Sequence, residues 1–159
     1  MEFIAHRGLM QGPDRQLENN PTQIQRALDK GFSCEIDLWI SEGRLFLGHD
    51  GPQYIVDEKY LDNKKFWIHA KNLTALKYLT ERSGLVYFWH QNDDYTLTSN
   101  GYIWTYPGKL LTDRSIMVMP EWTTKNFAVL DRNCFGVCSD YILEIKSFIK
   151  FIENSNKSF

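Results

Sequence analysis

Short apolar runs alternate along the chain with segments in which apolar residues recur every three or four positions. The runs predict strands at residues 3–5, 32–40, 45–47, 66–68, 85–89, 102–104, 116–119 and 135–138. The helical spacing predicts helices at residues 21–30, 73–82 and 142–152, the first entered through Pro21 and closed by Gly31. This succession of strands and helices is typical of a parallel sheet, with a hairpin through Gly43 added to it.

The length of the chain limits what that sheet can become. An ordinary (β/α)8 barrel uses about 250 residues and rarely fewer than about 200, whereas this chain has 159. Some seven short parallel strands are still enough to close, or nearly close, a barrel. We therefore expect an α/β fold, a compact, reduced TIM-like barrel in which loops replace several helices, as one domain over residues 1–159.

Composition limits the kinds of partner and the cellular compartment that we expect for the protein. The formal net charge is -2 and no long basic run occurs, which argues against a dedicated nucleic-acid binder. Three cysteines without close pairs indicate buried free thiols in a reducing compartment. No signal-peptide pattern is visible, and the apolar runs fall short of the roughly 20 residues that span a bilayer. We expect a cytoplasmic protein without stable membrane insertion; the oligomeric state is left open.

Polar residues with catalytic chemistry follow the predicted strands. All four histidines of the chain, His6, His49, His69 and His90, come directly after a strand, as does Asp50. The carboxyl ends of the strands form the active face of an α/β barrel, so this placement predicts a site. The alternative, that each histidine only satisfies local hydrogen bonds, explains one such position more easily than four.

Glu35 and Asp37 lie two apart on one predicted strand and therefore share a face. Two carboxylates held close together are costly unless a cation neutralises them, and oxygen ligands suit Mg²⁺ or Ca²⁺. An exposed alternating strand with acidic outer positions is the alternative. Arg7 offers a planar fork that matches phosphate oxygens, and His6 and His49 on opposite sides of a phosphorus could act as general acid and base.

The residues Ile4-Ala5-His6-Arg7-Gly8, Glu18-Asn19, Glu35-Ile36-Asp37 and Gly48-His49-Asp50 occur in that order within residues 4–50. In order and spacing they resemble the glycerophosphodiester phosphodiesterase family, within the phosphatidylinositol-phospholipase-C-like TIM barrels. The resemblance implies that His6 and His49 are catalytic, that Arg7 binds phosphate, and that Glu35 and Asp37 bind a metal. Glu18 would support the site, and Asp50 completes the last motif in a supporting role.

The chain departs from the family after residue 50. A third metal carboxylate usually stands in an E-x-K strand, but here the sequence is His69-Ala70-Lys71. Either His69 is the third ligand, which makes the site less selective for Mg²⁺ or Ca²⁺, or two carboxylates, waters and substrate hold the ion. Lys71 can still face the phosphate. The closing strand ends in Ser139-Asp140, where the family has a Thr-Asp pair.

His90 and Trp104 follow or end two further strands and are expected to bind the alcohol part of a substrate, although rim packing explains Trp104 equally well. The expected function is a metal-dependent phosphoric diester hydrolase that acts on a small glycerol- or sugar-type phosphodiester. Two alternatives stay open. One is a non-catalytic relative that binds a phosphorylated ligand, and the other is a lyase that releases a cyclic phosphate.

Overall fold

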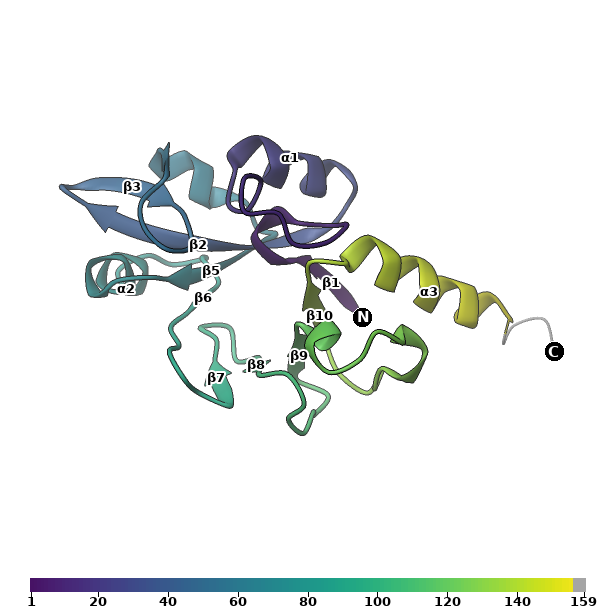
Figure 1. Ribbon diagram of the computed structural model, residues 1–159. Helices are drawn as coiled ribbons and strands as arrows, with labels where there is room; N and C mark the ends of the chain where they lie inside the picture. Colours follow the sequence, from purple (N-terminus) through teal and green to yellow (C-terminus); the bar gives the residue numbers. More distant parts are fainter. Residues whose placement is uncertain (156–159) are drawn as a thin grey trace.

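One curled sheet organises the protein, as seen in a computed structural model that describes residues 1–155 apart from the side chain of Val129 (Figure 1). The strands are β1 (Glu2–Ala5), β2 (Ser33–Ser41), β3 (Arg44–Leu47), β4 (Tyr54–Val56), β5 (Phe66–Ala70), β6 (Tyr87–Phe88), β7 (Tyr95–Leu97), β8 (Ile103–Thr105), β9 (Ser115–Val118) and β10 (Gly136–Ser139). The α-helices are α1 (Pro21–Asp29), α2 (Leu73–Thr80) and α3 (Ile142–Ser155). Single 3-10 turns are η1 (His6–Gly8), η2 (Glu58–Asp62), η3 (Pro120–Trp122) and η4 (Phe127–Val129).

The middle of the sheet is parallel, as the sequence predicts. Its strands follow the order β6-β5-β2-β1-β10-β9-β8, each parallel to the next. Antiparallel pairs lie at the margins, where β3 and β4 extend the far end of β2, and β7 pairs with β8. The predicted hairpin through Gly43 is confirmed, while β4 and β7 had no clear signal in the sequence.

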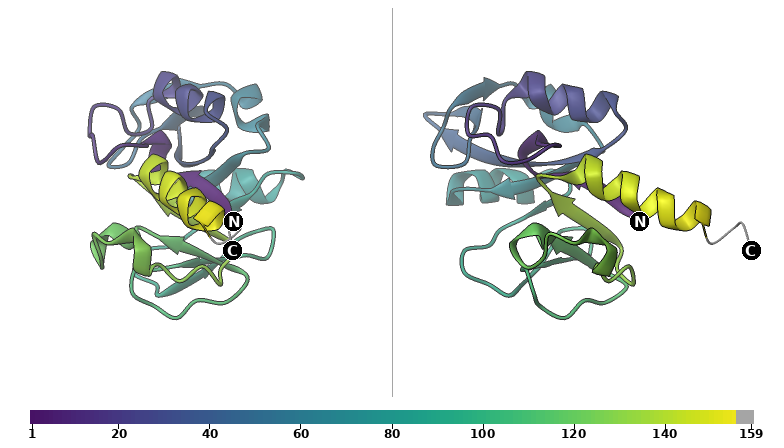
Figure 2. Two further views of the ribbon diagram at one scale, coloured as in Figure 1. Left: turned by 90° about the vertical axis from the view of Figure 1, so that its right-hand side faces the viewer. Right: turned by 45° about the vertical axis from the view of Figure 1, so that its right-hand side comes forward.

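The predicted TIM-like barrel is wrong. The sheet is an open, curled half-barrel in a mixed α/β fold, because β6 pairs only with β5 and no strand pairing among residues 1–155 joins it to β7 or β8. The described residues 1–155 form three α-helices, whereas a (β/α)8 barrel needs eight. The cause lies in residues 81–141, where short strands alternate with loops and 3-10 turns, so that no helical layer encloses that side (Figure 2).

The helices form close to their predicted positions, and side-chain caps begin two of them. The side chain of Asn20 accepts hydrogen bonds from the backbone of Thr22 and Gln23, and Pro21 fills the first turn of α1. Gly31 follows the helix with a φ of 84°, a conformation in which a β-carbon is strained. The Asn72 side chain caps α2 in the same way. Helix α3 packs on β1, β10 and η4.

Alternation along the parallel strands separates an apolar face from the face that carries the site. Ile36 of β2 and Ile68 of β5 join the large core beneath the helices. Their neighbours Glu35, Asp37 and His69 point to the concave face instead, because successive side chains of a strand alternate. A smaller apolar cluster lines the same concave side; it contains Ile4, Trp67, Phe88, Trp104, Ile116 and Cys138.

Across residues 1–155, no helix combines the length and the apolar composition required to cross a membrane.

Candidate functional site

Nearly all the side chains predicted to form a site meet at the carboxyl ends of the parallel strands. They line one pocket of about 740 Å³; its members from the predicted set are His6, Arg7, Glu18, Glu35, His49, Asp50, His69, Lys71, His90 and Trp104. Asp37 lies beneath them and is fully buried. The structure therefore brings together residues that lie up to 98 positions apart in the sequence, as between His6 and Trp104.

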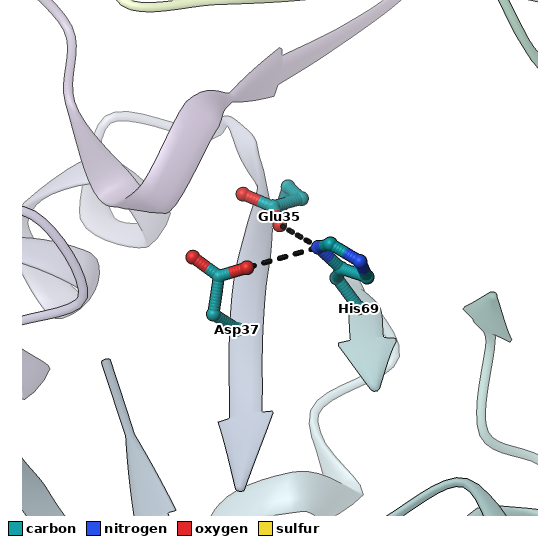
Figure 3. Close-up of side chains that lie close together, drawn as sticks. All are labelled: Glu35, Asp37 and His69. Carbon is teal, nitrogen blue, oxygen red and sulfur yellow. Dashed lines mark hydrogen bonds and ion pairs between the residues drawn. The ribbon is translucent and has the colours of Figure 1, made fainter. Parts of the chain in front are cut away.

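Glu35, Asp37 and His69 form a compact group of potential metal ligands (Figure 3). The parallel register of β2 and β5 sets Asp37 directly opposite His69. His69 Nδ1 lies 3.0 Å from Asp37 Oδ1 and 4.0 Å from Glu35 Oε1. All three residues are buried, and their ligand atoms lie within 4.8 Å of one another, so the group could hold a metal ion.

Asp37 is the most heavily contacted carboxylate of the site. Asn19 donates from its side-chain nitrogen to Asp37 Oδ2 over 2.9 Å, and its side-chain oxygen accepts from the Asp37 backbone over 2.9 Å. Arg7 Nε lies 3.1 Å from Oδ2, although out of line for a hydrogen bond, and Lys71 Nζ lies 3.4 Å from Oδ1.

Asp37 is ionised in this environment. Burial by itself would raise the pKa of Asp37, but the hydrogen bonds with His49 and His69 and the charge of Arg7 hold that pKa well below its usual range. The carboxylate is therefore a permanent negative centre below the pocket floor.

The pKa of Glu35 is shifted in the opposite direction to that of Asp37. Its Oε2 accepts from the Arg7 backbone over 3.1 Å and lies 3.9 Å from His6 Nε2. Burial first, and then the neighbouring charge of Asp37, raise the pKa of Glu35 above its ordinary value. A cation placed between the two carboxylates would relieve this repulsion.

The balance of charge in the cluster also fits a divalent cation. The cluster holds four carboxylates, those of Glu18, Glu35, Asp37 and Asp140. Among the described residues, only Glu18 and Asp37 form ion pairs with permanently cationic side chains, those of Arg7 and Lys71. Leaving the histidines aside, two negative charges remain without a permanent partner. Buried charges need such compensation, so the residues present fit a divalent ion.

His6 is held by a carboxylate from the far end of the chain. Its Nδ1 lies 2.8 Å from Asp140 Oδ1 and donates to it, because a carboxylate only accepts. Burial would lower the pKa of His6, but this hydrogen bond and the charge of Glu35 outweigh it and raise the pKa above its ordinary value. His6 is thereby poised to carry a proton on Nε2.

Asp140 is positioned in turn by Glu121, the residue after Pro120 in η3. The Asp140 backbone and the Ser139 hydroxyl both donate to Glu121 Oε1, over 2.9 and 2.8 Å. Burial is the main cause of the raised pKa of Glu121, against which these hydrogen bonds act. Its Oε2 is buried and has no hydrogen-bond partner within the described part of the chain.

His49 comes from a tight turn at the end of β3. Gly48 has a φ of 153°, and a β-carbon there would lie 2.1 Å from the Gly51 carbonyl oxygen, so only glycine fits. Arg7 Nη2 donates to His49 Nε2 over 3.3 Å, which requires Nε2 to be unprotonated. The hydrogen therefore sits on Nδ1, 3.3 Å from Asp37 Oδ2. Asp50 is 3.7 Å from Nε2 but largely exposed.

Arg7 owes its direction to a sharp turn after β1. Its φ of 51° is unusual for a residue with a β-carbon, and it lets the Arg7 backbone reach Glu35 while its guanidinium turns into the pocket. Nη1 donates to Glu18 over 2.7 Å. Gly8 follows with a φ of 78°, and a β-carbon there would come within 2.8 Å of Ile24.

Stacked rings form a further part of the pocket wall. Phe88 lies between His69 and Trp104, with ring centroids 5.1 and 4.4 Å away, and His90 stacks on His69 at 4.5 Å. Burial is the main cause that lowers the pKa of His90 to about 4, helped by the charges of His69 and Lys71, so His90 is neutral at pH 7. At the mouth, the exposed Trp122 meets Tyr106 at 6.3 Å.

Sequence reasoning missed three contributors to the site. Asn19 stands in the Glu18-Asn19 motif without a role of its own, yet its side chain holds Asp37, while the neighbouring Asn20 caps α1. Asp140 ends the predicted closing strand without an assigned role, and Glu121 is not among the predicted site residues. The pair Glu18-Asn19 was the available signal for Asn19, because both of its side chains serve the same cluster.

Comparisons of the chain with protein-family models, with curated proteins and with solved structures found no match in any of the three. The family resemblance therefore stays a prediction that rests on the motifs within residues 4–50.

Proposed function

We propose that this protein is a metal-dependent phosphoric diester hydrolase that acts on a small glycerol- or sugar-type phosphodiester. One observation carries the proposal. His6 donates from Nδ1 to Asp140, whereas His49 accepts at Nε2 from Arg7, so that one imidazole can give a proton and the other can take one. The two histidines flank a cluster of two cations and two potential metal carboxylates at one pocket. General acid and base groups beside an anion site are what diester cleavage needs.

The cationic side of the pocket would bind the phosphate. Arg7 presents its guanidinium beside His49, and Lys71 Nζ lies 3.4 Å from His49 Nδ1. Glu35, Asp37 and His69 would hold a divalent ion, which when bound neutralises charge on a phosphoryl oxygen. The neutral His90 and the exposed Trp122 would contact the alcohol portion of the substrate.

The histidines divide the proton transfers. His49 carries its hydrogen on Nδ1, so its Nε2, which accepts from Arg7 in this structure, would take the proton of an attacking hydroxyl as the oxygen–phosphorus bond forms. His6, with its raised pKa and its Nδ1 bound to Asp140, gives the Nε2 proton to the leaving alkoxide as the other oxygen–phosphorus bond breaks. The attacking hydroxyl belongs to water or, as the family resemblance implies, to the alcohol part of the substrate.

The test is hydrolysis of a panel of glycerol and sugar phosphodiesters with and without added divalent ions. His6→Gln and His49→Gln should each lower kcat/KM by about 10²- to 10⁴-fold. Lys77→Gln, an exposed change on α2, should leave it unaltered. Phosphorus NMR then separates a monoester product from a cyclic phosphate, which would reveal a lyase.

Two results would contradict the proposal. No turnover of any diester with any ion, together with tight binding of a phosphorylated ligand, would favour a binding protein. Turnover that survives both histidine substitutions would remove the assigned acid and base.

A further inference from the structure

The metal group contains an imidazole where an all-oxygen site would carry a third carboxylate. We propose that His69 is a direct nitrogen ligand and that it selects a transition ion such as Co²⁺, Zn²⁺ or Mn²⁺ over Mg²⁺ and Ca²⁺. The inference rests on the metal requirement of the proposed function, and it specifies the class of ion at that site.

The spacing of the donor atoms suits one ion. In octahedral coordination, bonds of about 2.1 Å place neighbouring ligand atoms about 3.0 Å apart and opposite ligand atoms about 4.2 Å apart. His69 Nδ1 is 3.0 Å from Asp37 Oδ1 and 4.0 Å from Glu35 Oε1. The spacing between Nδ1 and each carboxylate oxygen is therefore close to the spacing of two ligand atoms that bind the same ion (Figure 3).

The hydrogen bonds of the ring decide which nitrogen serves the ion. His69 Nε2 lies 3.4 Å from the backbone carbonyl oxygen of His90. A carbonyl can only accept, so Nε2 carries a hydrogen. Nδ1 is thereby the nitrogen that an ion would meet, in place of the hydrogen that it shares with Asp37. Metal-binding histidines are commonly oriented in this way by a carbonyl on the other nitrogen.

Stacking keeps the ring in that orientation. The centroid of the Phe88 ring lies 5.1 Å from that of the His69 ring, with an interplanar angle of 8°. The centroid of the His90 ring lies 4.5 Å from that of the His69 ring, with an angle of 15°. His69 is only 8% exposed, so its ring has little room to rotate away from Asp37. A ligand fixed by its neighbours before the ion arrives loses little conformational freedom on binding.

The donor chemistry then favours the softer ions. Mg²⁺ and Ca²⁺ prefer oxygen ligands, and replacing a carboxylate by imidazole removes a negative charge that would attract them. Co²⁺ and Zn²⁺ bind imidazole well and stand higher in the general order of affinity than Mn²⁺. Two carboxylates with one neutral nitrogen thus match a transition ion better than an alkaline-earth ion.

The experiment compares ions and ligands on the whole chain by calorimetric titration. Wild type should bind Co²⁺ and Zn²⁺ more tightly than Mg²⁺ and Ca²⁺, and His69→Gln should weaken Co²⁺ binding by about tenfold to a hundredfold. His69→Glu should restore Mg²⁺ or Ca²⁺ binding relative to Co²⁺. Lys77→Gln is the matched control, since it introduces the same side chain at an exposed pair on α2; its Co²⁺ affinity should stay near that of wild type.

A spectroscopic reading needs no variant to fold. Pulsed electron paramagnetic resonance of Mn²⁺ bound to the wild type should detect coupling to an imidazole nitrogen. Absence of that coupling, equal affinity for Mg²⁺ and Co²⁺, or a loss in Lys77→Gln as large as in His69→Gln overturns the inference, as does failure to bind any of the ions.

The same data separate this inference from the proposed function. Selective Co²⁺ binding with a nitrogen ligand but no diester cleavage would leave the metal class standing and remove the hydrolase. Cleavage supported equally by Mg²⁺ and Co²⁺ would leave the hydrolase standing and remove the metal class.

Discussion

Residues 1–80 and residues 81–141 build opposite walls of one pocket by different means. The first region supplies buried charges that are tied together by hydrogen bonds and backed by α1 and α2. The second supplies stacked rings from short strands, together with the buried carboxylates Glu121 and Asp140 behind His6, and its described residues form no α-helix. Charged groups in a buried site must satisfy specific partners, whereas rings need only contact area, so the two walls should respond differently to substitution.

The largest effect is expected on the charged wall. Arg7→Lys keeps the positive charge but cannot contact Glu18 and His49 at once, as the guanidinium does. Misplacing such a group should lower kcat/KM by about a hundredfold, measured by initial rates on a cleaved diester. Arg44→Lys, at an exposed pair on β3, is the matched control and should change nothing. A drop below fivefold would mean that the fork is not required.

A second substitution tests the network that supports the charged wall. Asn19→Ala leaves Asp37 without two hydrogen bonds in a fully buried place. Unfolding in urea should show a loss of about 2–3 kcal/mol in the free energy of unfolding. The exposed Asn92→Ala should stay within about 0.5 kcal/mol of wild type. Equal stabilities for the two variants would show that the network does not stabilise the fold.

The aromatic wall should tolerate a change of ring more readily. Phe88→Leu keeps most of the buried volume but removes the stacking with His69 and Trp104. We expect a loss of about 1 kcal/mol in the free energy of unfolding, less than for Asn19→Ala, measured by the same urea titration. A loss larger than that of Asn19→Ala would reverse the ranking of the two walls.

The smallest effect is expected at the mouth of the pocket. Trp122 is 63% exposed and meets the protein mainly through Tyr106, so Trp122→Ala should leave stability and kcat nearly unchanged. Losing one aromatic contact with substrate, worth about 0.5–1.5 kcal/mol, should raise KM roughly two- to tenfold. Leu110→Ala, at an exposed position outside the pocket lining, provides the comparison. A fall in kcat with an unchanged KM would place Trp122 elsewhere in the mechanism.

The two regions also differ in how much of their secondary structure the sequence predicts. In the first region, Pro21 and Gly31 bound a helix and Glu35-Ile36-Asp37 alternates across a strand, and both signals depend on local backbone geometry. In the second region, β6 has two residues and β7 three, too few for a clear pattern. The prediction of a barrel is wrong in this region, because loops and 3-10 turns leave the sheet open.

By itself, the sequence determined the short-range features of this protein: which histidines lie at or near strand ends, which carboxylates share a face, and where glycine permits a turn. Only the tertiary structure decided which of these features meet. His69 faces Asp37 because β2 and β5 pair in one register, and Asp140 reaches His6 across 134 positions because β10 lies beside β1. Local patterns follow from the backbone of neighbouring residues, whereas strand order is set by packing over the whole chain, and that packing also set the sheet's open shape.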